Sequence, residues 1–180
     1  MTLHVVHRQV PAEKISKRHP GATVIDVTSR GPQPWVRLSP FYPHGQIPVP
    51  LSPGAHSQTV EGIWQGLKVF ERADVDPSVM QITTMTGLKR TTRRYGPILG
   101  HRAGLDGDRL LDYATARRLI YLPTYRWVLT HRCAELLAQL RDRAAHGPVV
   151  LLDYGTNGDL ADESRPLSHA ALIKQHLDAP

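Results

Sequence analysis

The chain has 180 residues and an ordinary globular composition, with 41% hydrophobic and 21% charged residues. Its single cysteine, Cys133, excludes a disulfide framework and a cysteine zinc site. The longest purely aliphatic run, residues 149–152, is too short to span a membrane, and the N-terminus lacks the apolar stretch of a secretory signal. We therefore expect one soluble, cytoplasmic domain over residues 1–180, without a membrane partner.

The charge balance is basic. Lysine and arginine number 22 against 16 acidic residues, which gives a formal net charge of +6. Such a chain attracts phosphate groups of nucleic acids, nucleotides or sugar phosphates, although this charge can also serve solubility alone. Only 5 of the 22 cations are lysines. Each lysine is therefore of interest, because lysine can lose its proton and act as a nucleophile whereas arginine cannot.

The N-terminal third is predicted to be largely extended. Leu3–Val10 and Thr23–Thr28 are rich in β-branched residues and indicate strands, and Pro11–His19 indicates a short helix between them. Residues 31–54 carry many prolines and glycines, which exclude a helix or a central strand. The same stretch holds several large apolar residues, which favour an ordered loop packed on the core over a linker.

The rest of the chain is predicted to be mostly helical. Apolar residues recur at i, i+3, i+4 and i+7 from Val60, and Asp76-Pro77 is typical of an N-cap followed by a first-turn proline. These patterns predict a helix-rich α+β domain with a small β-sheet. The expected helices are Gln58–Glu71, a helix from Asp76 to Gly87, Asp108–Tyr121 ended by Pro123, Tyr125–Ala145 and Ser168–Leu177, and Val149–Asp153 is a short buried strand.

One face of the first of these helices carries polar side chains. Glu61, Gln65 and Lys68 fall at i, i+4 and i+7, so they share a face beside the apolar stripe. The row is either a solvated surface row or a carboxylate, an amide and an amine lining a cleft. Glu61 lies in the first turn, where the positive end of the helix dipole favours its ionised form.

A second candidate is the basic stretch Lys89–Arg94, which precedes a glycine-rich segment containing His101 and Arg102. No GKS or GKT sequence occurs, which excludes a P-loop. Guanidinium groups hold phosphate through paired hydrogen bonds. The stretch therefore indicates a phosphate or pyrophosphate clamp, a nucleic-acid-binding surface or a solvated basic segment.

A third candidate follows the predicted strand that ends at Asp153. Gly155 and the sequence Asn157-Gly158-Asp159 come directly after it. Glycines let a chain approach a ligand closely, but Asn-Gly-Asp is also strong turn chemistry. From these residues alone a turn is the favoured interpretation.

The ten histidines do not indicate a metal site. His4 and His7 lie three residues apart on a predicted strand and face opposite sides, and no HExxH sequence occurs. GxSxG is also absent, so a serine nucleophile has no support. Neither a metal nor a cofactor is predicted.

Two blocks of the sequence resemble a known enzyme family. The segment Leu38–Pro43 is similar to the LSNFYPSP-like loop, and Thr59–Phe70 to the TVEHYYQAQKF-like helix, of the NADAR (YbiA-like) N-glycosidases. Lys89 corresponds to the lysine of a downstream A-K-x-x-G-like element. Order and length of the later elements extend the resemblance over residues 35–160. The glutamate, first glutamine, lysine and phenylalanine of the helix pattern are matched by Glu61, Gln65, Lys68 and Phe70.

The resemblance implies hydrolysis of the N-glycosidic bond of a phosphoribosylated or ADP-ribosylated base, such as a ribosylamino-pyrimidine phosphate. A carboxylate stabilises the oxocarbenium-like state of this reaction, and a lysine can trap the opened sugar as a Schiff base. It implies catalytic roles for Glu61, for Lys68 or Lys89 as the amine, and for Asp153 or Asp159 in assisting water. The implied substrate-binding residues are Ser39, Phe41, Tyr42, Trp64, Gln65, Arg90, Arg93, Arg94, Arg102 and Arg118.

The sequence also departs from the family pattern. Gly62 and Ile63 replace the histidine and tyrosine after the glutamate, and the acidic loop lacks its tryptophan. These departures keep open an alternative function, a catalytically degenerate nucleotide- or nucleic-acid-binding module of the same fold. On either interpretation residues 35–160 form the core, 1–34 an N-terminal extension and 161–180 a C-terminal helix. The oligomeric state is not predicted.

Overall fold

Helices and short strands are mixed along the chain in the computed structural model, which describes residues 2–179, and the predicted α+β class is confirmed. The chain divides into two compact units, which are described separately. Unit 1 comprises Met1–Ser39 and Leu129–Pro180, and unit 2 comprises Pro40–Val128. The single domain over residues 1–180 stays a prediction.

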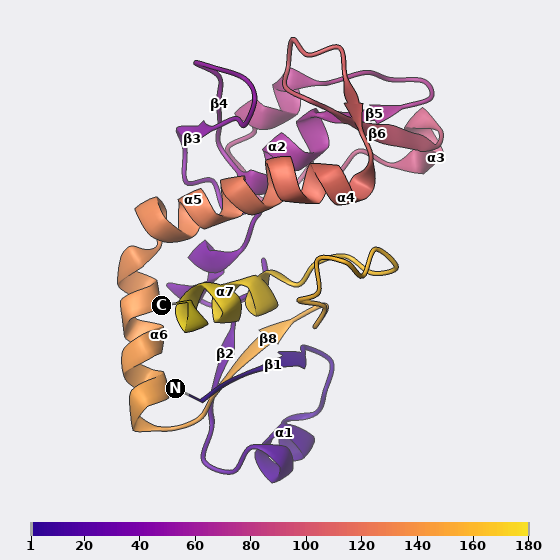
Figure 1. Cartoon of the computed structure of the whole chain (residues 1–180). Helices are drawn as coiled ribbons and strands as arrows, with labels where there is room; N and C mark the ends of the chain where they lie inside the picture. Colours follow the sequence, from indigo (N-terminus) through magenta and orange to yellow (C-terminus); the bar gives the residue numbers. More distant parts are fainter. Residues whose placement is uncertain (1, 180) are drawn as a thin grey trace. The chain divides into compact units, whose positions relative to one another are not determined.

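Unit 1 is built around a parallel sheet of β1 (Leu3–His7), β8 (Val149–Asp153) and β2 (Thr23–Asp26), in that order (Figure 1). The central strand is buried along Val149–Leu151, as its aliphatic sequence requires of a strand flanked on both sides. The three predicted strands are confirmed. Because β1 and β2 both pair with β8, the expected N-terminal extension is an integral part of this sheet.

Helical segments complete unit 1. They include α1 (Ala12–Arg18), the 3₁₀ turn η1 (Trp35–Leu38), α6 (Ala134–His146) and α7 (His169–Asp178). Both α6 and α7 contact β8, and their leucines and Ile173 supply buried core side chains. The predictions of helices at Pro11–His19 and Ser168–Leu177 are confirmed.

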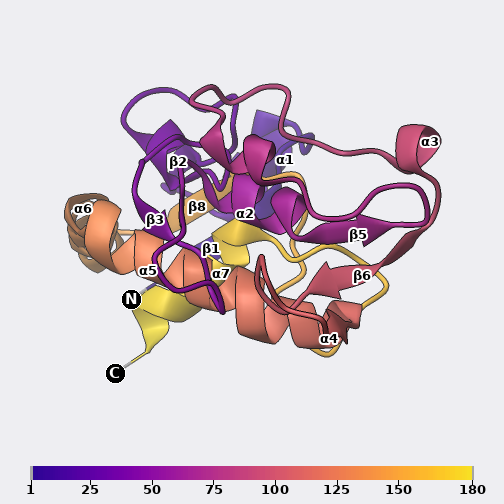
Figure 2. The same cartoon turned by 90° about the horizontal axis from the view of Figure 1, so that it is seen from above.

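Unit 2 contains two antiparallel sheets. A small ribbon pairs β3 (Ile47–Pro48) with β4 (His56–Ser57). The other sheet has the order β5 (Lys68–Phe70), β6 (Ile98–Arg102) and β7 (Leu110–Leu111). Figure 2 shows β5 and β6 side by side. Ile47 and Val49 are buried, so the prediction that the proline-rich stretch is an ordered, packed segment is confirmed.

The helix predicted over Gln58–Glu71 is shorter than expected. It forms α2 (Val60–Gly66), and the chain then enters β5. Gly62 and Gly66 lower the helix propensity, while Val69 and Phe70 are strand formers that pair with β6. At Gly66 an added Cβ would lie 2.7 Å from Met80 Cε, so the glycine permits close packing of α2 on the following turn. The prediction was therefore wrong for residues 68–71.

The helix predicted from Asp76 to Gly87 was also too long. Only a 3₁₀ turn, η2 (Pro77–Gln81), forms there. Asp76 caps it as expected, since its carboxylate accepts a hydrogen bond from the Ser78 N–H. The following residues, Ile82-Thr83-Thr84, are β-branched and continue without helix. A four-residue helix, α3 (Thr92–Tyr95), lies in the basic stretch before β6.

Pro123 does not end the helix predicted over Asp108–Tyr121. The helix starts at α4 (Tyr113–Ala116), passes through the π-helical segment η3 (Arg117–Tyr121) and continues as α5 (Leu122–Arg132). The wider π-helical turn accommodates a residue that has no N–H to donate. The helix predicted over Tyr125–Ala145 is instead broken at Cys133, which stands between α5 and α6 with a non-helical φ of −123°.

None of the helices formed by residues 2–179 combines the length and apolar character that crossing a bilayer needs.

Candidate functional site

The N-terminal turn of α2 in unit 2 is fixed by its own residues. The Thr59 hydroxyl caps the helix by accepting a hydrogen bond of 2.7 Å from the Gly62 N–H. The Glu61 N–H, which has no partner within the helix, donates to the Pro40 carbonyl at 2.9 Å. The segment that contains Pro40 is thus joined to α2 by a main-chain hydrogen bond, and Glu61 is held at the start of the helix.

Glu61, Gln65 and Lys68 form a buried hydrogen-bonded row. The Gln65 amide nitrogen donates to Glu61 Oε1 at 2.8 Å, and Lys68 Nζ donates to Gln65 Oε1 at 3.2 Å. All three side chains are buried, so the solvated surface row is excluded. Lys68 lies on β5 rather than on the helix, and the predicted shared helix face is wrong for this residue. Lys68 still reaches Gln65 because only Leu67 separates the end of α2 from the start of β5.

Arg90 closes the row from a segment 22 residues beyond Lys68. Its main-chain N–H donates to Gln65 Oε1, and its guanidinium donates to the carbonyls of Gln65, Lys68 and Asp74 at 3.1, 2.7 and 2.7 Å. The guanidinium also lies 5.0 Å from the ring centroid of Phe70. In this structure Arg90 ties the end of α2 to β5, and its role in phosphate binding stays a prediction.

Burial shifts the titration of Glu61 and Lys68 toward their neutral forms. Loss of solvent raises the pKa of Glu61, against the opposing effects of the Gln65 hydrogen bond and of Lys68 and Lys89. Loss of solvent also lowers the pKa of Lys68, assisted by Arg90 and Lys89 and opposed by Glu61. The site therefore favours an amine that gives up its proton more readily than a surface lysine.

An aromatic cluster adjoins this row. The Trp64 ring stacks on His101 of β6 with centroids 3.8 Å apart, and the ring of Tyr121 meets Trp64 edge-on at 5.6 Å. His101 is 2% exposed. Desolvation and the nearby charge of Lys68 lower the pKa of His101 to about 3, so its imidazole is neutral at ordinary pH.

The remaining predicted aromatic and lysine residues of unit 2 lie near the surface. Lys89 is exposed, with its Nζ 5.7 Å from the centroid of the Phe41 ring. Tyr42 is half-buried, with its ring 4.8 Å from that of His44. Of the two candidate nucleophiles, Lys68 is the buried one that is linked to Glu61.

The predicted arginines differ in their surroundings. Arg93, Arg94 and Arg118 are exposed, and the Arg94 guanidinium lies 5.1 Å from the centroid of the Tyr95 ring. Arg102 forms an ion pair with Asp74 at 2.9 Å and donates to the Asp108 carbonyl. Arg93 and Arg94, which lie together on α3, are thus open to a phosphate group, as is Arg118, whereas Arg102 is already paired.

Asp153, Asp159 and Ser39 belong to unit 1. Asp153 is buried at the end of β8, where its carboxylate accepts hydrogen bonds from the Ser168 hydroxyl and the Ala170 N–H and lies 3.0 Å from the His169 ring. Ser39 is buried after η1. These contacts account for Asp153 as a structural group within unit 1, and its assistance to water stays a prediction.

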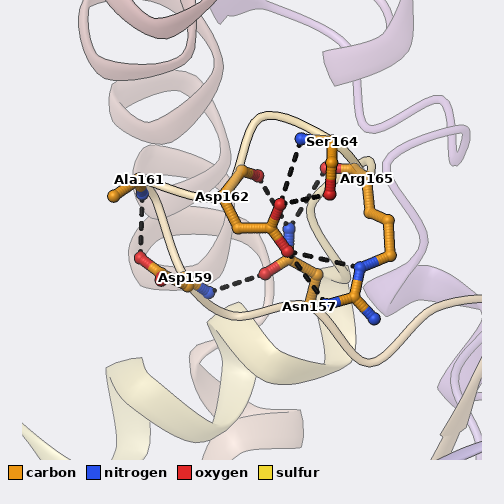
Figure 3. Close-up of polar contacts among 6 residues, drawn as sticks. All are labelled: Asn157, Asp159, Ala161, Asp162, Ser164 and Arg165. Atoms are coloured by element: carbon orange, nitrogen blue, oxygen red, sulfur yellow. Dashed lines mark hydrogen bonds and ion pairs between the residues drawn. The ribbon is translucent and has the colours of Figure 1, made fainter.

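The loop after β8 forms the turns that its sequence favoured (Figure 3). Asn157 Oδ1 accepts from the Asp159 N–H at 2.9 Å, and Asp159 Oδ1 accepts from the Ala161 N–H at 2.8 Å. Asp162 continues the pattern with Ser164 and forms an ion pair with Arg165. Within residues 2–179 no group of three or more histidine, cysteine or acidic side chains is arranged to hold a metal ion.

Residues 7–173 match a family that is described only as a family of unknown function, DUF6939. The chain belongs to the DUF6939 family. A search of curated proteins found no match. A search of solved structures found none either.

In this DUF6939 member His101 was not assigned to the site from sequence, and Arg90 was assigned to substrate binding but not to the contacts that it makes here. His101 stood out only as part of a cationic, glycine-rich segment, and its pairing with Lys68 depends on the register of β5 and β6. The tie made by Arg90 depends on carbonyl groups that any residue could supply. Neither contact has a local sequence signal.

Proposed function

We propose that the protein is an N-glycosidase that hydrolyses the bond between ribose C1 and the nitrogen of a phosphoribosylated or ADP-ribosylated base. The observation that carries this proposal is the buried row of Glu61, Gln65 and Lys68, which couples a carboxylate to an amine through one amide. The same three residues match the NADAR-like pattern, so chemistry and resemblance favour one site.

The proposed reaction uses each group in a defined step. The Lys68 amine attacks C1, the C1–N bond to the base breaks, and a proton of the amine passes to the leaving base. The sugar ring of the resulting glycosylamine then opens as the C1–O4 bond breaks and O4 takes up a proton, which leaves an iminium between C1 and the lysine nitrogen. Water then adds to the resulting iminium carbon and releases the sugar as its aldehyde, with the lysine amine restored. Glu61 stabilises positive charge that develops at C1. The net change is substrate plus water giving free base plus ribose 5-phosphate or ADP-ribose.

The exposed cations of α3 support the proposed substrate class. Arg93 and Arg94 lie on the surface of the same unit as Glu61 and Lys68. Guanidinium groups suit phosphate or pyrophosphate oxygens. The same exposure is the observation that favours the second candidate, a non-catalytic module that binds nucleotides or nucleic acid.

The test is incubation with a panel of ribosylated bases, including ribosylamino-pyrimidine phosphates and ADP-ribosylated guanine, followed by mass spectrometry for released sugar. We expect Glu61→Gln and Lys68→Ala each to lower kcat/KM by a factor of about 100 or more. The matched controls Glu71→Gln and Lys17→Ala change exposed residues of the same types and should retain activity. Borohydride reduction during turnover should leave a sugar adduct on Lys68.

Full activity in both Glu61→Gln and Lys68→Ala would contradict the proposed site. Absence of any released sugar across the panel, together with salt-sensitive binding of single-stranded nucleic acid, would favour the non-catalytic module instead. Release of sugar without a borohydride adduct would replace the lysine step by direct attack of water.

A further inference from the structure

His101 on β6 is a buried polar side chain whose ring nitrogens are poorly satisfied. Its exposed fraction is 2%, and within residues 2–179 neither Nδ1 nor Nε2 makes a hydrogen bond of good geometry, although the main chain of Trp64 is close enough to act on the ring. Buried polar side-chain atoms are nearly always paired in native proteins, so a poorly satisfied pair of ring nitrogens requires an explanation. Packing alone does not explain it, since an apolar ring would fill the same place without the desolvation cost.

The register of the sheet puts His101 beside Lys68. β5 and β6 are antiparallel, and Lys68 is the register partner of His101. Directly opposed residues of an antiparallel pair project to the same face of the sheet. The Trp64 ring stacks on the imidazole at 3.8 Å and limits how the ring can turn. The imidazole is therefore a fixed neighbour of the lysine side chain.

Lys68 lacks the acceptors that its charged form needs. In the described part of the chain Nζ makes one hydrogen bond, to Gln65, although an ammonium group has three donors. The charged groups that act on it are Glu61 on α2 and the cations Lys89 and Arg90, and only Glu61 attracts the ammonium. A lysine that forms a Schiff base must pass through a charged iminium, so a neutral acceptor nearby would serve the reaction.

We propose that His101 is a positioning residue for Lys68. Its unprotonated ring nitrogen accepts a hydrogen bond from Lys68 Nζ whenever Nζ carries positive charge. This inference rests on the proposed role of Lys68 as the amine nucleophile. His101 suits the task because its imidazole stays neutral, with one acceptor nitrogen, and does not compete with Lys68 for the proton.

The test measures the titration of Lys68 directly, in the full-length protein without substrate. In protein labelled with ¹³C at lysine Cε, five resonances are expected, and the one missing in Lys68→Ala belongs to Lys68. His101→Phe keeps a ring against Trp64 but removes the acceptor, so the Lys68 midpoint should fall by about one pH unit, a tenfold change in its proton affinity. His101→Asn restores an acceptor and should stay close to wild type.

The matched control is His56→Phe, an exposed histidine of the same unit, which should leave the Lys68 midpoint unchanged. An unchanged midpoint in His101→Phe, or an equal fall in His101→Asn, would overturn the proposal. If His101→Phe does not fold, the proposal is tested instead by a pH titration of the histidine ¹⁵N shifts in wild-type protein labelled with ¹⁵N-histidine. One neutral imidazole should then shift at the Lys68 midpoint in wild type but not in Lys68→Ala, and no such response would overturn the proposal.

The lysine and histidine titrations do not depend on the proposed activity, so the His101 result can be interpreted even if no compound of the substrate panel is hydrolysed. Where activity is found, the acidic limb of the kcat/KM profile should move to lower pH in His101→Phe. A residue that served packing alone would change stability without moving either the midpoint or this limb.

Discussion

At the scale of single residues, Gln65 has the side chain that holds the candidate site together. Its amide nitrogen donates to Glu61, and its amide oxygen accepts from Lys68 Nζ and from the Arg90 N–H. The glutamine amide offers two donor hydrogens on its nitrogen and a separate acceptor oxygen on one uncharged side chain. Glutamate would add a second carboxylate beside Glu61, and an apolar residue would satisfy neither neighbour.

We predict that Gln65→Leu lowers the free energy of unfolding by about 3 kcal/mol, because buried groups of Glu61, Lys68 and Arg90 each lose a partner. Urea denaturation at neutral pH measures the change. The control Gln139→Leu replaces an exposed glutamine of α6 and should change stability by less than about 0.5 kcal/mol. Equal stability of the two variants would contradict the buried hydrogen-bonded row.

The sequence spacing correctly predicted that Glu61, Gln65 and Lys68 lie together, but the reason why Lys68 lies there differs from the predicted one. The pattern treated all three as one helix face, whereas the helix ends at Gly66 and Lys68 starts a strand. The contact persists because one residue separates the two elements. His101 could not be found in this way, since its contact with Lys68 depends on strand pairing between segments 33 residues apart.

At the scale of elements, one carboxylate joins the end of β8 to the start of α7. Asp153 accepts from the Ser168 hydroxyl at 2.7 Å and from the Ala170 N–H at 3.2 Å, and it lies 3.0 Å from His169 Nδ1. His169 Nε2 in turn lies 2.8 Å from the carbonyl of Val27, just after β2. The N-terminus of α7 is thus tied to two strands of the parallel sheet.

We predict that this tie makes unit 1 acid-sensitive. Burial alone would raise the pKa of Asp153, but its bonds to His169, Ser168 and Ala170 outweigh burial and hold it below its ordinary value. The ionised carboxylate therefore stabilises the fold above the unfolded pKa of about 3.9, and this stabilisation disappears as the pH falls through the lower folded value.

Urea denaturation at pH 7, 5 and 3 tests this. Asp153→Asn should lose stability at pH 7, by about 2 kcal/mol, and show a smaller further loss at pH 3 than wild type does. The control Asp106→Asn, at an exposed position, should follow the wild-type profile. Parallel profiles for wild type and Asp153→Asn would show that another group causes the acid sensitivity.

Helix boundaries were predicted correctly where a capping residue adjacent in sequence marks them. They were predicted wrongly where a contact with a residue far away in the sequence sets the boundary. Ser168 caps α7 through the Ala171 N–H, and this signal is local. The break at Cys133 has no such signal. Its buried thiol contacts the carbonyl of Arg37, almost a hundred residues earlier in the chain. Pro123 failed as a stop because the preceding π-helical turn accommodates it.

At the scale of the whole molecule, the order of the strands in the sheets could not be predicted from the sequence patterns. Strand character at both ends of the chain was evident, but nothing local indicates that β1 and β2 flank β8 in one parallel sheet. Pairing of β1 with β8 joins Leu3 to Val149, across most of the chain. Composition and charge, in contrast, come directly from the sequence. The net charge of +6 leads to a separate prediction about phosphate binding.

The question at this scale is whether phosphate binding depends on total charge or on where the arginines lie. Arg93→Gln with Arg94→Gln removes two positive charges from α3, and Arg18→Gln with Arg141→Gln removes two from exposed sites in unit 1. Net charge falls equally in both double variants. Nonspecific binding of a single-stranded oligonucleotide, which follows the overall field and weakens steeply with salt, should therefore decline to a similar extent in both.

Binding of ribose 5-phosphate should separate them. We predict that only the Arg93/Arg94 double variant loses affinity, by a factor of about 10, because a compact phosphate group is held by guanidiniums placed beside it rather than by distant charge. Calorimetry at two salt concentrations measures both ligands in the same variants. Equal loss of ribose 5-phosphate affinity in the Arg18/Arg141 variant would mean that the basic balance acts only as a general field, and it would remove α3 from the proposed substrate site.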